Sequence, residues 1–255
     1  MGRPDKPVDR TVPARAKLAD FLRARKEAVG MTYEQMAKST NGVPTLSTAT
    51  LKRAASGTCV PSWVTVSDFI EATATEEELL IDSTLAARAR GHELWVAARR
   101  ATRAPYYVHK APDPALASSE SDFLRFLRHQ HVWAGYPTPG EMQQSVEHPW
   151  DLPTSTTRRI IAGDIMPVSP QQATAFLKAC HVVAPVDLEP WLAAAVRALS
   201  SNPSSKRDLR PWIKEHQDLI DYINGTKKGV DTSVVRLLTN ELGVHQAENR
   251  SGLAA

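Results

Sequence analysis

The stretch LSTATLKRAASGTCVP, at residues 46–61, decides how this chain is interpreted, because the chain contains a second version of it. That version, LPTSTTRRIIAGDIMP, lies at residues 152–167, an offset of 106 residues. Leu, two Thr, Arg, Gly and Pro recur at equal intervals in the two stretches. Self-similarity at a fixed offset is typical of a duplicated supersecondary unit, so the repeat predicts two copies of one domain.

The similarity extends on both sides of this stretch. Downstream, residues 66–74 resemble residues 173–181. Upstream, ADFLRARKEAVG at residues 19–30 resembles SDFLRFLRHQHV at residues 121–132, at an offset of 102 residues. This smaller offset places four extra residues before the second helix of the second copy.

Both copies carry the apolar spacing of helices. Leu18, Phe21 and Leu22 recur at helical spacing in the first copy, as Phe123, Leu124 and Leu127 do in the second. No two alternating apolar runs are joined by a tight turn, so no hairpin is predicted. The predicted fold class is therefore all-α: two tandem five-helix domains plus a small C-terminal helical extension.

Capping residues locate the ends of several predicted helices. Thr32 and Ser47 or Thr48 are candidate N-caps, because a hydroxyl accepts from the free N–H groups of a first turn. Pro139 suits a first helical position. Gly57 and Gly163 stand where the repeated helix must end in a left-handed conformation. In the first copy, one long fifth helix is expected over roughly residues 76–102.

These signals divide the chain into five parts. Residues 1–15 are predicted to be a flexible basic arm, and residues 104–120, rich in Pro, Ala and Ser, a linker. The two repeated domains are placed at residues 16–103 and 121–200, and a C-terminal helical pair at residues 207–245.

Composition excludes several classes of protein. The chain has 255 residues, 42% of them hydrophobic, which is ordinary for a globular protein. No apolar run approaches the ~18–20 residues that cross a bilayer, and the polar N-terminus does not resemble a signal peptide. Two cysteines suit a reducing compartment, so a cytoplasmic location without membrane contact is expected. Neither a phosphate loop, a nucleophile elbow nor a metal-ligand set is present, and we expect no enzyme, cofactor or metal.

Charge is distributed unevenly along the chain. Residues 1–62 hold 11 Lys and Arg against 5 Asp and Glu, whereas residues 105–200 hold 7 against 9. A basic end on a near-neutral chain suggests a polyanionic partner for the first copy. A solvated basic tail explains the same charge equally well.

The residues MTYEQMAKSTNGVPTLSTATLKRAASGTCVPSWVTVSDFIEA, at 31–72, resemble the lambda-repressor/Cro family of helix-turn-helix domains, in the tandem version found in actinobacterial regulators. Residues 137–180 are a weaker match. In both copies the turn between the second and third helices is about four residues longer than in the best-known members. The resemblance implies that the third helix of each copy enters the major groove of duplex DNA.

The first copy carries the stronger set of candidate DNA contacts. Leu51 and Ala54 fall on one face of the predicted helix over residues 47–57 and would anchor it to the core. The resemblance implies that Thr48, Ala49 and Arg53 approach base edges, and Ser47, at the start of the helix, is a further candidate DNA contact. Lys52 is better placed for a phosphate. Ser62 and Trp63, at the start of the fourth helix, can offer N–H groups to a phosphate.

The second copy leaves two interpretations open. Thr154, Ser155, Arg158 and Arg159 occupy the matching places, which favours DNA. However, Thr157 replaces the anchoring Leu51, and Glu141, Glu147, Asp151 and Asp164 lie nearby in the sequence. This copy is either a second DNA reader or a degenerate domain used for self-association or a protein partner.

The sequence therefore predicts a sequence-specific duplex-DNA-binding protein, a transcriptional regulator with a recognition helix in each of two domains. The alternative is an interaction adaptor or antitoxin-like component that binds a protein partner through one or both domains. Self-association through the second domain or the C-terminal helices is a further expectation.

Overall fold

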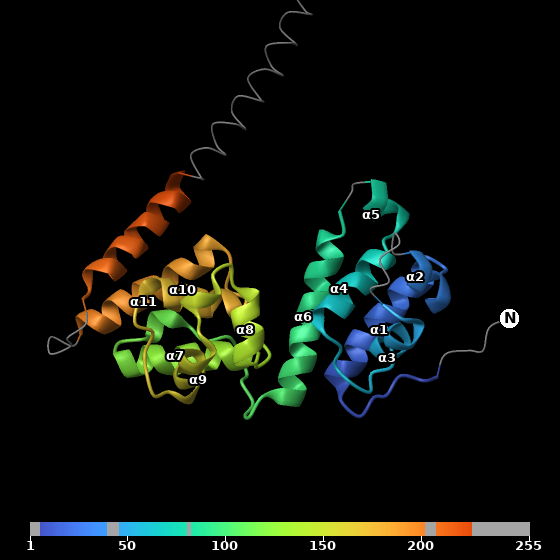
Figure 1. The fold of residues 1–255 in the computed structure, drawn as a ribbon, viewed down its shortest axis with the longest axis horizontal. Helices are drawn as coiled ribbons and strands as arrows, with labels where there is room; N and C mark the ends of the chain where they lie inside the picture. Colours follow the sequence, from blue (N-terminus) through green and yellow to red (C-terminus); the bar gives the residue numbers. More distant parts are fainter. Residues whose placement is uncertain (1–5, 40–45, 81–82, 202–207, 226–255) are drawn as a thin grey trace, which may run out of the picture. The chain divides into compact units, whose positions relative to one another are not determined.

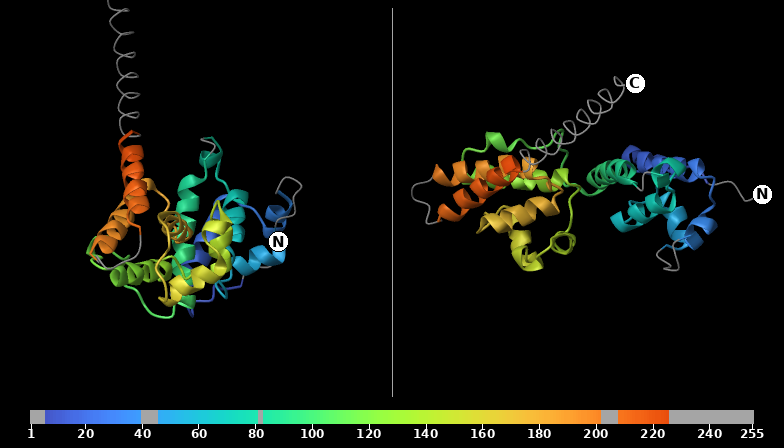
Figure 2. Two further views of the ribbon diagram at one scale, coloured as in Figure 1. Left: turned by 60° about the vertical axis from the view of Figure 1, so that its left-hand side comes forward. Right: turned by 90° about the horizontal axis from the view of Figure 1, so that it is seen from above.

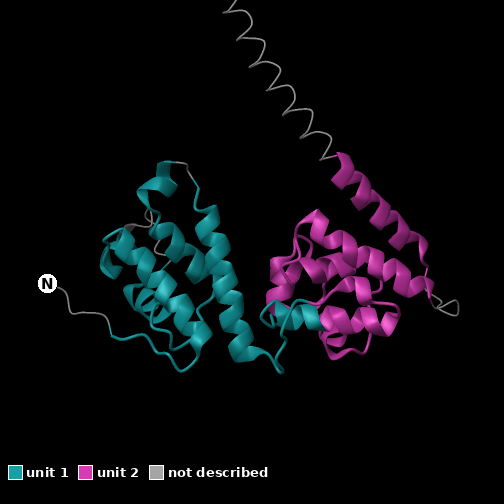
Figure 3. Cartoon of the chain, turned by 180° about the vertical axis from the view of Figure 1, so that it is seen from behind, with its two compact units in different colours: residues 1–111, 129–138 teal, residues 112–128, 139–255 magenta. Residues whose placement is uncertain are grey.

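The computed structural model describes residues 6–39, 46–80, 83–201 and 208–225, and every regular element in these residues is a helix (Figure 1). The chain divides into two compact units (Figure 3). Unit 1 comprises residues 1–111 with 129–138, and unit 2 comprises residues 112–128 with 139–255. The all-α fold class is thus confirmed.

Six helices lie wholly within the described residues of unit 1: α1 (Pro13–Ala28), α2 (Tyr33–Ser39), α3 (Thr48–Ala54), α4 (Trp63–Ala72), α5 (Glu76–Leu80) and α6 (Leu85–Arg103). Helix α1 packs along α6 and α4, and α3 packs between α2 and α4 (Figures 1 and 2). The single long helix expected over residues 76–102 is wrong. A break separates α5 from α6, and after it the Ser83 hydroxyl accepts from the Leu85 N–H at 3.3 Å, which favours a new helix start there.

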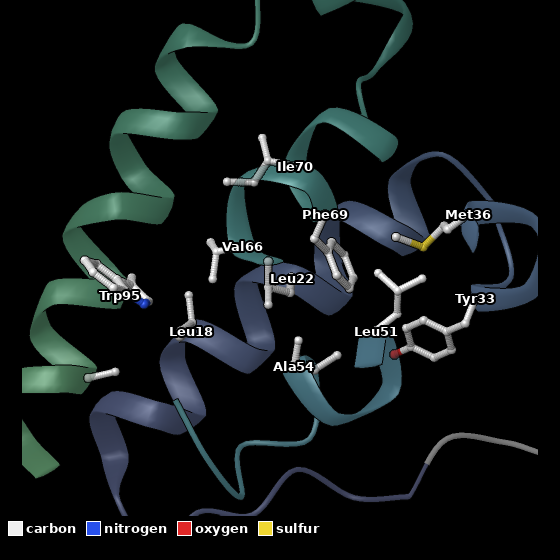
Figure 4. Close-up of a cluster of buried hydrophobic side chains, with 12 residues drawn as sticks. Leu18, Leu22, Tyr33, Met36, Leu51, Ala54, Val66, Phe69, Ile70 and Trp95 are labelled. Carbon is white, nitrogen blue, oxygen red and sulfur yellow. The ribbon is translucent and has the colours of Figure 1, made fainter. Parts of the chain in front are cut away.

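One apolar cluster holds unit 1 together (Figure 4). Leu22 of α1 and Phe69 of α4 are fully buried, and Leu51 of α3 is 1% exposed against them. Trp95 of α6 lies at the end of the cluster near Leu18, and its indole donates to the Pro61 carbonyl at 2.9 Å. The short α3 is therefore held by burial of its inner face rather than by its own length.

Residues 6–12 are not a free arm, which corrects the expectation for the described part of residues 1–15. The Asp9 N–H donates to the Ser56 carbonyl at 2.9 Å, and Arg23 donates to the Lys6 carbonyl at 2.7 Å. Arg10 pairs with Asp20 at 2.9 Å. This segment therefore packs on the turn that follows α3.

Unit 2 begins inside the predicted linker. A short 3-10 helix, η1 (Pro114–Leu116), packs against α11 (Pro185–Ser200). Arg197 of α11 donates to the carbonyls of Ala117 at 2.8 Å and Pro114 at 3.1 Å. The linker prediction over residues 104–120 is therefore wrong at its C-terminal end, because hydrogen bonds from Arg197 attach that end to unit 2.

The remaining elements of unit 2 follow the order of unit 1. They are α7 (Glu120–Trp133), of which residues 129–133 are grouped with unit 1, α8 (Pro139–Ser145), the 3-10 helix η2 (Pro149–Asp151), α9 (Thr154–Ala162) and α10 (Pro170–Ala179). Residues 210–225 form a further helix, in which Trp212 is 1% exposed. Its His216 contacts Glu189 of α11 at 2.8 Å. The second helix of the predicted C-terminal pair lies outside the described residues.

The packing corrects the register of the first helices. Leu18 and Leu22 of α1 are buried, and the buried positions of α7 are Phe123 and Leu127, an offset of 105 residues. The sequence match at an offset of 102 is therefore displaced by about one helical turn. With the corrected register, the two copies differ by one residue, not four, before the second helix.

Candidate nucleic-acid interface

Helix α3 begins at a defined cap and presents a polar outer face. The Ser47 hydroxyl accepts from the Thr50 N–H at 3.2 Å. Of the two candidate caps, Ser47 and Thr48, it is therefore Ser47 that caps the helix. Leu51 and Ala54 are 1% and 3% exposed, which confirms the predicted anchor. The outer face carries three exposed side chains, namely Ala49, Lys52 and Arg53, with Thr48 half-buried beside them.

The two cations of α3 have different surroundings. Arg53 is exposed, and its guanidinium makes no hydrogen bond or ion pair within the described residues. Lys52 instead pairs with Glu34 of α2 at 2.9 Å and lies 5.9 Å from the centre of the Tyr33 ring. Both partners of this pair are about half exposed, and such a pair is worth at most about 1 kcal/mol. Lys52 can therefore exchange Glu34 for a phosphate at little cost.

The start of α4 presents less to a phosphate than expected. The Ser62 hydroxyl is occupied as the cap, since it accepts from the Thr65 N–H at 3.1 Å. The Trp63 ring packs edge-on against the His92 ring, with 4.8 Å between the ring centroids. It also packs at a tilt against the Trp95 ring, with 5.6 Å between the centroids. Burial in this aromatic cluster lowers the pKa of His92. Trp63 is therefore chiefly a packing residue, and the backbone N–H groups of the first turn are what α4 can offer.

Helix α9 is anchored although Thr157 replaces leucine. Thr157 is fully buried, and its hydroxyl donates to the Pro153 carbonyl at 2.9 Å. Because the hydroxyl is satisfied, burying it carries no large penalty. Ile160 is fully buried on the same face. Thr157, at the position of Leu51, therefore still anchors α9 to unit 2. It does not count against DNA binding by the second copy.

The outer face of α9 is more cationic than that of α3. Ser155, Arg158 and Arg159 are exposed, and Thr154 is half-buried at the first helical position. Neither guanidinium has a hydrogen bond or an ion pair within the part of the chain that the structure describes. The position matching Glu34 is Gly140, so no carboxylate faces Arg158 there. None of the acidic residues near α9 in the sequence forms an ion pair with its arginines within the described residues.

Both outer helices are attached at their C-terminal ends in the same way. Arg23 of α1 donates through Nε to the Ala55 carbonyl at 2.8 Å, and Arg128 of α7 donates to the Ile161 carbonyl at 2.9 Å. Gly57 and Gly163 have φ of 76° and 92°, which confirms the predicted left-handed positions. The sequence match did not reveal that Arg23 and Arg128 are equivalent. Its offset of 102 residues aligned Arg23 with Arg125 instead.

Other kinds of site find little support in the described part of the chain. Among the described residues, no three His, Cys, Asp or Glu side chains are grouped as they would be around a metal ion. No helix in that part of the chain has the length and apolar character needed to span a bilayer. Cys180 is buried, and burial raises the pKa of its thiol. The described surface does carry exposed arginines without a partner there, namely Arg53 on α3 and Arg158 and Arg159 on α9.

The comparison with known families agrees with this geometry. Residues 17–80 match a family model described as a helix-turn-helix domain, so this part of unit 1 is a helix-turn-helix domain. The match runs from α1 to α5 and includes α3, and it confirms that residues 31–72 belong to a helix-turn-helix domain. No curated protein and no solved structure matches the chain. Domains of this class bind DNA by laying their second motif helix in the major groove.

Proposed function

We propose that this chain is a non-enzymatic, cytoplasmic regulator of transcription that binds duplex DNA sequence-specifically with two tandem helix-turn-helix domains. Helix α3 of unit 1 and helix α9 of unit 2 would each enter the major groove at one half-site. The observation that carries the proposal is the matched pair Arg53 and Arg159. Each is exposed and unpaired within the described residues, on a helix whose opposite face is buried.

The roles of the side chains follow from their surroundings. An unpaired arginine can pair bidentately with guanine, so Arg53 and Arg159 are assigned to base edges. Ala49 and Ser155 are small and exposed at the front of their helices, which allows a close approach to the bases. Lys52 and Arg158 lie one position earlier than the arginines and are assigned to phosphates, which position the helix without sequence information.

Unit 2 is included because its helices repeat the caps and anchors of unit 1. Ser169 caps α10 by accepting from the Gln172 N–H at 3.2 Å, as Ser62 caps α4. Met36 and Met142 are both buried, and so are Phe69 and Phe176. The matching pattern of caps, burial and arginine attachment supports one fold used twice. Two such domains on one chain can recognise half-sites that need not be palindromic.

The experiment is selection of duplex sites from random DNA by the full chain, followed by a binding titration of the selected site against salt. If Lys52, Arg53 and the basic stretch before residue 62 neutralise ~4–6 phosphates, log K should fall with log salt at a slope of about −4 to −5. Failure to enrich any duplex sequence, or a flat salt response, would contradict the proposal and favour the adaptor function.

A further inference from the structure

The turn between α8 and α9 presents an aromatic surface that the DNA-binding proposal does not use. Trp150, on η2, is 72% exposed. Its ring stacks on His148 with a centroid distance of 4.9 Å and an interplanar angle of 13°. A tryptophan that buries so little in its own domain contributes little to its core. Exposed aromatic residues on a fixed backbone are frequent anchors of protein interfaces.

This turn is fixed from both sides. Gln143 of α8 donates to the Pro149 carbonyl at 3.2 Å, and Gln172 of α10 donates to the Asp151 carbonyl at 3.4 Å. Leu152, the next residue, is fully buried. The ring pair is therefore presented on a preorganised backbone, which reduces the entropy lost when a partner binds.

A pocket of about 180 Å³ lies beside the ring pair. Its wall comes from the turn that carries His148, from α10 and from the helix at residues 210–225, all within unit 2. The charged lining consists of three carboxylates, Glu147, Asp151 and Glu215, and one ammonium group, Lys178. The pocket is thus acidic overall. It is smaller than the roughly 300–1,000 Å³ of typical small-molecule sites and suits a single side chain.

Several polar groups of this wall have no partner in the part of the chain that the structure describes. The Thr174 hydroxyl is buried at the pocket without a hydrogen bond. Neither Glu147 nor Asp151 forms an ion pair there, although Lys178 also lines the pocket. The Glu147 and Asp151 carboxylates are therefore open to a cationic partner, and they lie beside the exposed aromatic pair.

We propose that this surface, defined by His148, Trp150 and the acidic pocket, binds a basic segment of a protein partner, with an arginine side chain in the pocket. A guanidinium can pair with the Asp151 or Glu147 carboxylate and stack on an aromatic ring. An acidic lining repels phosphate, so the same surface does not suit DNA. The site is independent of the arginines of α9, none of which lines the pocket.

The probe is a short acetylated and amidated peptide containing two arginines separated by glycine, titrated into the full chain. The readout is the indole N–H resonance of Trp150 in an NMR spectrum, identified by its loss in Trp150→Phe. We expect a saturable shift that the lysine version of the peptide reproduces more weakly and the glutamate version does not produce. Asp151→Asn and Glu147→Gln should each weaken binding by about two- to five-fold, the range of exposed ion pairs.

The control variant is Glu76→Gln on α5, which removes an exposed carboxylate from unit 1 and should leave the affinity for the peptide unchanged. The proposal is overturned if the Trp150 resonance does not move, or if the Asp151→Asn/Glu147→Gln double variant binds as well as the original chain. It is also overturned if Trp150→Phe weakens DNA binding as strongly as Arg159→Ala, because the turn would then belong to the DNA interface. Sedimentation provides a further test. A dimer that dissociates when the peptide is added would overturn the proposal, because the surface would then bind a second copy of this chain.

Discussion

Arg53 and Lys52 are neighbours on α3, but their surroundings predict different effects of substitution. Arg53→Ala removes an unpaired guanidinium assigned to a base, so it should cost about 1–3 kcal/mol and relax the preference at one base pair. Lys52→Ala should weaken binding to all sequences about equally. Titrations against the selected site and single-base variants distinguish the two. Equal behaviour of the two variants would contradict the assignment.

The Lys52 ammonium group lies 2.9 Å from the Glu34 carboxylate, so Glu34 competes with a DNA phosphate for Lys52. Glu34→Gln should therefore strengthen DNA binding by a few-fold and steepen the salt slope by up to about 1. The matched control is Glu27→Gln, which removes an exposed carboxylate from α1. If the control strengthens binding as much as Glu34→Gln, the effect is general charge repulsion and the specific competition is absent.

Two glycines should respond oppositely to alanine. A Cβ on Gly57 would lie 2.6 Å from the Asp9 carbonyl oxygen, and its φ of 76° is unfavourable for alanine. Gly57→Ala should destabilise the protein by about 1–3 kcal/mol. A Cβ on Gly140, in α8, would meet no atom within 4 Å, so Gly140→Ala should stabilise the protein by up to about 1 kcal/mol. Thermal unfolding of both variants is the measurement, and a stable Gly57→Ala would mean that residues 6–12 do not pack on the turn.

At the scale of elements, Glu78 links three helices of unit 1. Its carboxylate accepts from Arg25 of α1 at 3.0 and 2.8 Å and caps α5 through the Thr75 N–H at 2.8 Å. Arg25 in turn donates to the Thr73 carbonyl after α4 at 2.7 Å. Chiefly the hydrogen bonds from Arg25 lower the pKa of Glu78 from 4.5 to about 2.

This lowered pKa gives a pH prediction. The carboxylate is favoured in the folded state, so its stabilisation is complete above about 4.5 and is lost as the pH falls through about 2. Glu78→Gln should lower the free energy of unfolding at neutral pH by about 1–3 kcal/mol, and the gap from the original chain should close as the pH falls. Chemical denaturation from pH 7 to pH 2 measures both, with Glu76→Gln as the control. A constant gap across this range would contradict the assignment.

Most of the helices and their anchors could be predicted from the sequence. Leu51, Ala54, Gly57 and Gly163 carry local signals, namely helical spacing and left-handed positions, and all four lie where those signals indicate. The register of the first helices could not be predicted from the sequence. The letters DFLR occur in both copies, but they occupy different positions relative to the buried face of the helix. Buried Phe123 and Leu127, rather than the shared letters, set the register of α7.

The candidate site was predictable in position but not in its pairings. Exposure of Arg53 and Arg159 follows from helical spacing, whereas the Lys52–Glu34 contact depends on how α2 packs on α3. The role of Thr157 also depends on tertiary structure, since only the nearby Pro153 carbonyl makes a buried hydroxyl acceptable. Trp63 was assigned to DNA from its place in the sequence, but the aromatic cluster with His92 and Trp95 half-buries it.

At the scale of the whole molecule, the charge of the chain is unevenly divided between the two units. The residues of unit 1 hold 17 Lys and Arg against 12 Asp and Glu, and this unit carries the matched helix-turn-helix domain. Unit 2 combines two unpaired arginines on α9 with a separate acidic pocket beside Trp150. A low net charge in unit 2 is therefore compatible with DNA binding, because phosphate affinity depends on the charge at the contacting face.

The most direct test of the two-domain account is a footprint of the full chain on its selected site, compared with Arg53→Ala and Arg159→Ala after all three proteins show the same melting transition. The account predicts two protected half-sites for the original chain, and each substitution should weaken protection at a different half-site. Each should also cost about 1–3 kcal/mol in affinity. An Arg159→Ala protein with unchanged footprint and affinity would contradict the central claim, because DNA would then be recognised by unit 1 alone.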